Sequence, residues 1–135
     1  DTNVVSELRK VRSGKANRGV AEWAVTRASA EMFVSAITIH ELEHGVLLME
    51  RSDAAQGAVL RSWLDESVAA AFAERVLVVD EHVARRAAAL HVPDPAPFRD
   101  ALIGATALVH HMTVVTRNVA DFENFDGLEI HNPWT

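Results

Sequence analysis

Residues 32–42, Met-Phe-Val-Ser-Ala-Ile-Thr-Ile-His-Glu-Leu, form the stretch that decides the fold. Its first part, residues 32–37, is apolar and rich in residue types that favour strands, so it predicts a buried strand. Residues 38–51 predict a helix. The stretch therefore indicates a strand that leads directly into a helix, with the acid Glu41 near the start of that helix.

Strands and helices are expected to alternate along the rest of the chain. Further strands are predicted over residues 76–79, 113–116 and 128–131, and further helices over residues 4–11, 19–28, 53–71, 81–90 and 98–111, with Asp80 as an N-cap. This alternation predicts an α/β fold, a three-layer α/β/α sandwich with a mainly parallel central sheet. An apolar strand should also lie directly before Asp1, where the sequence starts, so we expect that this first strand is truncated.

The length and composition indicate a single domain over residues 1–135. The chain has no cysteine, so it can form neither a disulfide nor a thiolate metal site, and a cytoplasmic location is expected. No apolar run approaches the roughly 20 residues of a membrane span, so no membrane association is expected. The net charge of −6 argues against indiscriminate binding to nucleic acid, although residues 9–18 carry five basic side chains and no acid. That segment is either a phosphate contact or a solvated loop.

Four acidic side chains lie next to predicted strands or at the start of a predicted helix. Asp1 would end the first strand, Glu41 follows the second strand, and Asp121 follows the strand at residues 113–116. Asp100 lies in the first turn of its helix, on the apolar face, so it should point inward. Since the carboxyl ends of parallel strands meet at one edge of a sheet, we expect these acids to converge there.

Carboxylates that converge at the edge of a core repel one another and need a compensating cation. Oxygen ligands in a chain without cysteine favour a hard cation, Mg²⁺ or Mn²⁺. Such a cation suits the hydrolysis of phosphate esters. The sequence therefore predicts metal-dependent phosphoryl chemistry at the edge of the sheet.

A second motif supports a different chemistry. His40-Glu41-Leu42-Glu43-His44 fits the pattern H-E-x-x-H, in which two histidines on one helix bind Zn²⁺ and the glutamate acts as a base. A third ligand is required, and Glu66 could supply it. A zinc metalloprotease therefore stays an alternative, although it leaves Asp1 and Asp100 without a role.

The acidic segments, taken together, resemble PIN-domain ribonucleases, specifically the VapC toxins of bacterial toxin–antitoxin pairs. The opening Asp1-Thr2-Asn3 and the closing Asn132-Pro133-Trp134 are part of this resemblance, and the closing motif is similar to the FitB-like branch. Between them the matching segments are residues 37–45, 98–107 and 114–122, in the expected order. The resemblance covers essentially the whole chain.

The resemblance implies a metal-dependent endoribonuclease that a cognate VapB-like antitoxin holds inactive. It implies that Asp1, Glu41 and Asp100 hold Mg²⁺ or Mn²⁺ and that Asp121 is a further catalytic acid. The family often has aspartate at the position of Asn118, so either Asn118 or Asp121 completes the site. The resemblance also implies a homodimer or a larger toxin–antitoxin assembly that reaches DNA only through the antitoxin.

Several polar residues are candidates for supporting roles in this ribonuclease. Thr116 either orients a water or phosphate near the metal or simply ends its strand. Arg9, Lys10, Arg12 and Arg117 are candidates for contacts to RNA phosphates. The substitution at Asn118 also keeps open a third possibility, a catalytically degenerate PIN-fold module that only binds its partner.

Overall fold

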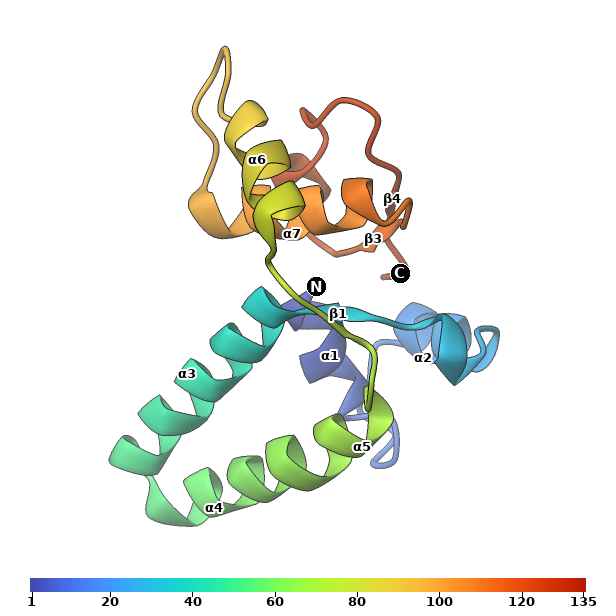
Figure 1. The fold of residues 1–135 in the computed structure, drawn as a ribbon. Helices are drawn as coiled ribbons and strands as arrows, with labels where there is room; N and C mark the ends of the chain where they lie inside the picture. The colour runs from blue at the N-terminus through green and yellow to red at the C-terminus, as the bar shows by residue number, and fades with distance from the viewer.

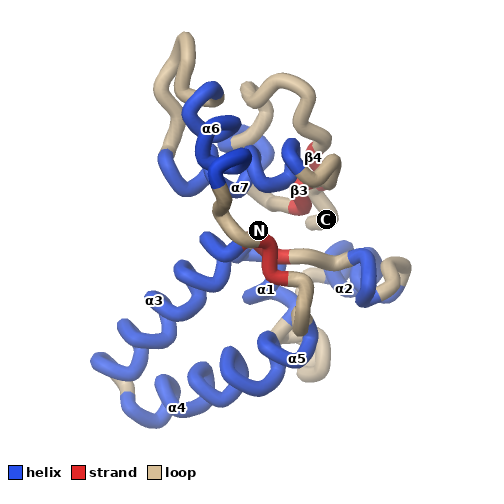
Figure 2. The backbone as a smooth tube through the Cα atoms, in the orientation of Figure 1, coloured by secondary structure: helices blue, strands red, loops and turns tan.

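The computed structural model describes residues 1–135 and contains two pairs of parallel strands (Figures 1 and 2). Strand β1 (Val34–Ser35) pairs with β2 (Val76–Leu77), and β3 (Val114–Val115) pairs with β4 (Ile130–His131). The predicted α/β class and the parallel direction are confirmed. The strands nevertheless form two separate pairs, whereas the sequence predicted one central sheet.

Helices occupy every segment in which the sequence predicted them, within a few residues at each end. The predicted helix over residues 53–71 is a succession of α-helix, π-helix and α-helix. The helices are α1 (Thr2–Leu8), α2 (Arg18–Val25), α3 (Ala36–Ser52), α4 (Ala54–Ser62), the π-helix η2 (Trp63–Val68), α5 (Ala69–Ala71), α6 (Glu81–Ala89), α7 (Phe98–Val109), and the short 3₁₀ turns η1 (Ser29–Glu31) and η3 (Val119–Asp121). None of them combines the length and apolar content that crossing a bilayer requires.

Side-chain caps explain where several of these helices begin. The Ser35 hydroxyl accepts a hydrogen bond from the backbone N–H of Ile37 at 3.0 Å, so β1 ends and α3 starts two residues earlier than the sequence predicted. Asp80 caps α6 as predicted, because its carboxylate accepts from the Val83 N–H at 2.9 Å. The carboxylate of Asp1 caps α1 in the same way. One candidate catalytic acid is therefore also a structural cap.

Two separate clusters of buried apolar side chains form the core. The first joins α1, β1, α3 and η2 through Val5, Val34, Leu42, Val46, Leu64, Val68 and Phe72. The second joins α6, α7, β3 and the residues after η3, and its members include Val83, Leu102, Ile103, Val114, Phe122 and Phe125. In Figure 1 the helices α3 to α5 form the lower part of the molecule, and α6, α7, β3 and β4 form the upper part. Candidate site residues come from both parts.

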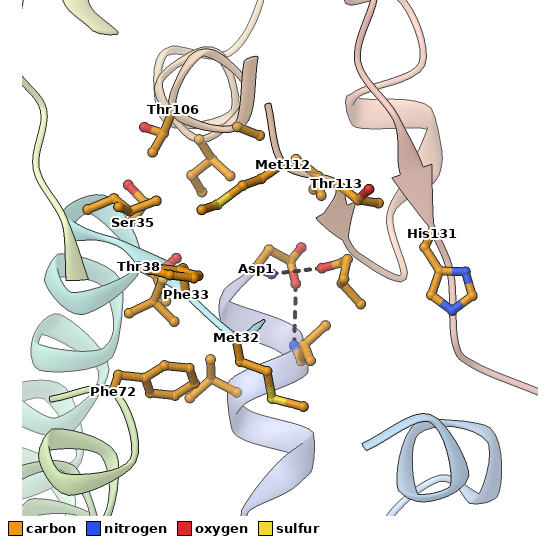
Figure 3. Close-up of a pocket in the computed structure, with 18 of the residues that line it drawn as sticks. Asp1, Met32, Phe33, Ser35, Thr38, Phe72, Thr106, Met112, Thr113 and His131 are labelled. Atoms are coloured by element: carbon orange, nitrogen blue, oxygen red, sulfur yellow. Dashed lines mark hydrogen bonds between the residues drawn. The ribbon is translucent and has the colours of Figure 1, made fainter. Parts of the chain in front are cut away.

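A cavity of about 360 Å³ lies between these two parts. Residues of β1 line one side of it and residues of β3 line the other, together with apolar side chains such as Val4, Phe72 and Ile103 (Figure 3). The backbone nitrogen of Asp1 already donates to the Val115 carbonyl of β3 at 2.7 Å. The cavity thus lies between the two strand pairs and is lined by Asp1, before which a first strand was predicted. Whether such a strand precedes Asp1 stays a prediction.

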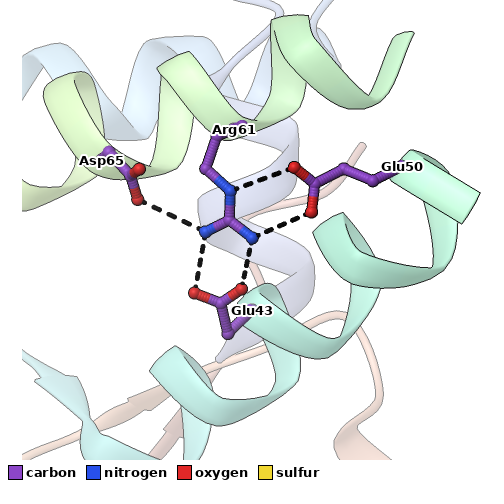
Figure 4. A network of polar contacts seen from close by, with 4 residues as sticks. All are labelled: Glu43, Glu50, Arg61 and Asp65. Atoms are coloured by element: carbon purple, nitrogen blue, oxygen red, sulfur yellow. Dashed lines mark hydrogen bonds and ion pairs between the residues drawn. The ribbon is translucent and has the colours of Figure 1, made fainter. Parts of the chain in front are cut away.

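Helices α3 and α4 form a projecting hairpin that an arginine holds together (Figure 4). The Arg61 guanidinium forms a bidentate pair with Glu43, with distances of 2.8 and 2.6 Å, and also contacts Glu50 at 3.1 Å and Asp65 at 3.5 Å. These hydrogen bonds and charges lower the pKa of Glu43 and raise the pKa of Arg61 further. At the same interface Gly57 lies against the backbone of Glu50. The helices can approach closely because residue 57 has no side chain.

Two glycines of this hairpin should respond oppositely to the same substitution. In Gly57→Ala the added methyl would lie 2.5 Å from the Glu50 Cα, so we expect a loss of about 1–3 kcal/mol in the free energy of unfolding. In Gly45→Ala nothing lies within 4 Å, so alanine should stabilise α3 by about 0.5–1 kcal/mol. Urea unfolding of both variants checks this, and equal effects would contradict the described packing.

The cavity should accept an added strand. We expect that a short extension of Val and Ile residues fused before Asp1 raises the free energy of unfolding by about 1–2 kcal/mol, since burial of aliphatic side chains outweighs the ordering of the segment. A Gly-Ser extension of the same length is the matched control and should give no increase. Thermal unfolding compares the two proteins, and equal melting temperatures would show that the cavity does not bind a strand.

Candidate active site

Asp1 is held in place by contacts to α1 and to the end of β3. One carboxylate oxygen accepts a hydrogen bond from the Thr116 hydroxyl at 2.6 Å, and the other accepts from the Val4 N–H at 3.3 Å. Thr116 is completely buried, and its hydroxyl oxygen also accepts from the Asn118 N–H at 2.9 Å. The orientation of Asp1 is therefore fixed by a buried donor from the other half of the molecule.

Glu41 lies on α3 and contacts two other elements. One of its carboxylate oxygens accepts from the Thr2 hydroxyl of α1 at 3.1 Å, and the other lies 3.7 Å from a terminal nitrogen of Arg99 on α7. Glu41 thus faces the start of α1, as the sequence predicted.

Asp100 lies in the first turn of α7, between Arg99 and the buried residues of the same helix. Burial raises the pKa of Asp100, the negative charges of Asp121 and Glu41 raise it further, and the positive charge of Arg99 opposes them. The carboxylates of Glu41 on α3 and Asp121 in η3 are therefore each close enough to act on Asp100 on α7. The structure thus brings Glu41 and Asp121 near Asp100, and the convergence of all four acids at one metal site stays a prediction.

The acids do not form a ready-made metal cage. No group of three or more histidine, aspartate or glutamate side chains is close enough to hold a metal ion as the side chains stand. The Asp1 carboxylate is engaged by Thr116, and Glu41 is paired with Arg99. The available metal ligands are carboxylate oxygens, and few positive charges lie beside them. Such ligands suit a hard divalent cation.

Residues 114–122 contain one acid, Asp121, and one amide, Asn118, which the structure places differently. Asp121, in η3, raises the pKa of Asp100 and is therefore the carboxylate that reaches the site. Asn118 is exposed, and its recorded hydrogen bonds are made by its backbone, to Thr116 and Asp121. Of the two residues that the sequence left open, Asp121 is the one whose charge acts on the converging acids.

The basic candidates lie away from the acids or have other partners. Arg9 packs over the ring of Trp63 at 5.8 Å, and Lys10 pairs with Glu7 at 3.1 Å. Both follow α1, whose seven residues rise roughly 10 Å from Asp1. Arg12 is exposed in the following turn. Arg117 packs over Trp134 at 5.9 Å. The structure therefore does not gather these basic residues at the carboxylates.

The histidine motif has no third ligand. His40 and His44 are exposed on α3, with ring centroids 6.5 Å apart. The Glu66 carboxylate accepts a hydrogen bond from the Ser62 hydroxyl at 3.0 Å within its own helical segment. The two histidines and Glu66 do not form a group that could hold zinc.

Two residues that contact the acids were not among the predicted site residues. Thr2 bonds Glu41, and Arg99 forms the ion pair with the same carboxylate. Both are adjacent in sequence to predicted acids, Asp1 and Asp100, and that adjacency was the available signal. Which carboxylate they contact depends on how α1 and α7 pack beside α3, and a sequence pattern does not contain that information.

The fold and the site define a class of protein: a small α/β domain with parallel strands and converging carboxylates. A family model described as PIN domain matches residues 1–128, and the chain belongs to the PIN domain family. This match confirms the resemblance that the sequence motifs indicated.

Known proteins resemble the chain over nearly its whole length. Toxin FitB of Neisseria gonorrhoeae (strain ATCC 700825 / FA 1090) is 35% identical over 140 residues, which cover 99% of this chain and 96% of FitB. VapC ribonuclease Y4jK of Sinorhizobium fredii (strain NBRC 101917 / NGR234) is 34% identical over 139 residues, with 99% and 95% covered. The solved structure of FitAB bound to an IR36 DNA fragment has a TM-score of 0.88 at 32% identity and covers 100% of this chain and 94% of that chain.

Loss of the Thr116 hydroxyl should destabilise the protein. In Thr116→Val the Asp1 carboxylate and the Asn118 N–H both lose a buried partner, so we expect a loss of about 1–3 kcal/mol in the free energy of unfolding. Thr116→Ser keeps the hydroxyl and should lose less. Thr113→Val removes an exposed hydroxyl from the same strand region and serves as the control. Urea unfolding measures all three, and a harmless Thr116→Val would contradict the described role of the hydroxyl.

Proposed function

We propose that the chain is the ribonuclease toxin of a toxin–antitoxin pair and hydrolyses RNA phosphodiester bonds with Mg²⁺ or Mn²⁺. The observation that carries this proposal is the approach of Asp121 and Glu41 to Asp100, whose pKa is raised by burial and by these two charges, while Thr2, next to Asp1, donates to the same Glu41. The similarity to a protein named as a toxin and to one named as a ribonuclease supports it.

Asp1, Glu41 and Asp100 would hold the cation, and Asp121 in η3 would add a further negative charge. When bound, a divalent cation supplies positive charge that stabilises the phosphate as it is attacked by water. The chain's own contribution is orientation and desolvation. Thr116 and Thr2 fix the carboxylates of Asp1 and Glu41 through hydrogen bonds. Asp100 is partly removed from water at the start of α7.

Asn118 is a neutral residue at a position where the family often has aspartate. It can offer only a neutral carbonyl oxygen, so the site has less negative charge than one with aspartate there. We therefore propose one well-held metal ion in the free protein, with a second arriving only together with RNA. A degenerate module would instead bind its partner and never cleave RNA, whatever metal is added.

We further propose the partners that the resemblance implies. A VapB-like antitoxin would hold the toxin inactive, and a basic side chain of that antitoxin could pair with the acids in place of metal. A net charge of −6 supports contact with DNA through the antitoxin rather than directly. A homodimer or a larger toxin–antitoxin assembly, acting in the cytoplasm where RNA and antitoxin are made, completes the proposal.

Removal of single carboxylates tests this function. Asp1→Asn, Glu41→Gln and Asp100→Asn should each reduce Mn²⁺-dependent cleavage of RNA about 100-fold or more, because each substitution removes one charge that holds the cation. The assay uses purified protein without antitoxin, and circular dichroism verifies that each variant is folded.

The matched controls are His40→Ala and His44→Ala on the exposed face of α3, which should keep most of the activity. If all three carboxylate variants cut RNA at the parental rate, the site is wrongly assigned. Loss of activity in both histidine variants, with zinc bound to the parental protein, would support the metalloprotease instead. A folded parental protein that cuts no RNA with Mn²⁺ or Mg²⁺ would support the degenerate module.

A further inference from the structure

Arg99 is the only cationic side chain that forms an ion pair with any of the four candidate acids. Its terminal nitrogen lies 3.7 Å from a Glu41 oxygen, and all other ion pairs of the chain involve different acids. Arg99 lies directly before Asp100 at the start of α7. Its positive charge acts on Asp100 as well, since it opposes the rise in the pKa of that acid. Arg99 is thus positioned beside the candidate metal site.

This ion pair is weak compared with the other arginine contacts. A charge-assisted hydrogen bond from arginine is typically about 2.7–2.9 Å long, and the Arg99–Glu41 distance of 3.7 Å exceeds that. The Arg99 side chain is 60% exposed, so a large part of it is open to water. By contrast Arg61 uses its whole guanidinium to bind carboxylates, and Arg75 donates to two backbone carbonyls. Arg99 therefore retains unused donors close to the acids.

We propose that Arg99 releases Glu41 when the divalent cation binds and then contacts a phosphate group of the RNA. This inference rests on the proposed function. In the free protein Arg99 offsets part of the negative charge of Glu41. If Glu41 held a divalent cation, the Arg99 guanidinium would lose this partner and would be free to bind a phosphate through paired N–H donors. Arg99 is on this account a positioning residue for RNA and a competitor of the metal.

The exchange gives two effects of opposite sign. Removal of Arg99 should strengthen metal binding in the absence of RNA, because the cation no longer competes with the guanidinium for Glu41. The same removal should weaken the interaction with RNA, because one phosphate contact is lost. A residue with only a structural role would weaken both, so the opposite signs distinguish the two explanations.

Arg99→Gln, Arg99→Lys and the control Arg86→Gln test the proposal. Arg86 is exposed on α6 and forms no ion pair. Calorimetric titration with Mn²⁺ measures metal affinity without RNA, where we expect roughly twofold to fivefold tighter binding in Arg99→Gln. Steady-state cleavage of a single-stranded RNA at saturating Mn²⁺ should give a KM increased roughly tenfold, with kcat much less affected.

Salt dependence and the conservative variant complete the test. The slope of log affinity for RNA against log salt concentration should fall by roughly 0.7 in Arg99→Gln, because one phosphate contact is lost. Arg99→Lys keeps the charge but not the planar fork, so it should keep the parental metal affinity and recover only part of the KM. Arg86→Gln should behave like the parental protein in all three measurements.

Unchanged metal affinity and KM in Arg99→Gln would overturn the proposal, and so would a loss of both. A parental protein that binds Mn²⁺ but cleaves no RNA would contradict the proposed ribonuclease instead. The competition between Arg99 and the metal would then still be decided by the titration, because that measurement needs no RNA.

Discussion

The contact between Asp1 and the end of β3 is the constraint on which the rest of the structure depends. The Asp1 backbone nitrogen donates to Val115, and its carboxylate accepts from the buried Thr116 hydroxyl. These bonds join two parts of the molecule that have separate apolar clusters and a cavity between them. The same carboxylate caps α1. One side chain therefore fixes a helix, connects both parts of the fold and contributes an acid to the site.

The negative charges of the protein are compensated in the α3–α4 hairpin and are largely uncompensated at the candidate active site. In the α3–α4 hairpin Arg61 is surrounded by three acids at short distances, so charge there stabilises the packing of two helices. At the candidate active site the acids have one weak cationic partner, Arg99, and burial raises the pKa of Asp100. The negative charges near Asp100 therefore remain largely uncompensated in the folded protein. The proposed divalent cation would compensate them on binding.

The elements and their order could be predicted because the local signals agree. Apolar runs of β-formers marked the first three of the four strands, and Asp80 marked the start of α6. The strands are shorter than predicted, and for β1 the reason is that the Ser35 hydroxyl begins α3 before the apolar run ends. The two separate strand pairs were not predicted, because strand pairing depends on which edges meet in three dimensions and not on the pattern of any one segment.

The sequence by itself determined the fold class and the candidate acids, since short motifs fix which residues end strands or begin helices. It placed Asp1, Glu41 and Asp100 together, and the structure brings their elements together. Only the tertiary structure decided that Thr116 orients Asp1, that Thr2 and Arg99 contact Glu41, and that the charge of Asp121 reaches Asp100. The physical reason is that hydrogen bonds and charge interactions act over a few ångströms, and those distances are set by the packing of α1, α3 and α7 and not by sequence spacing.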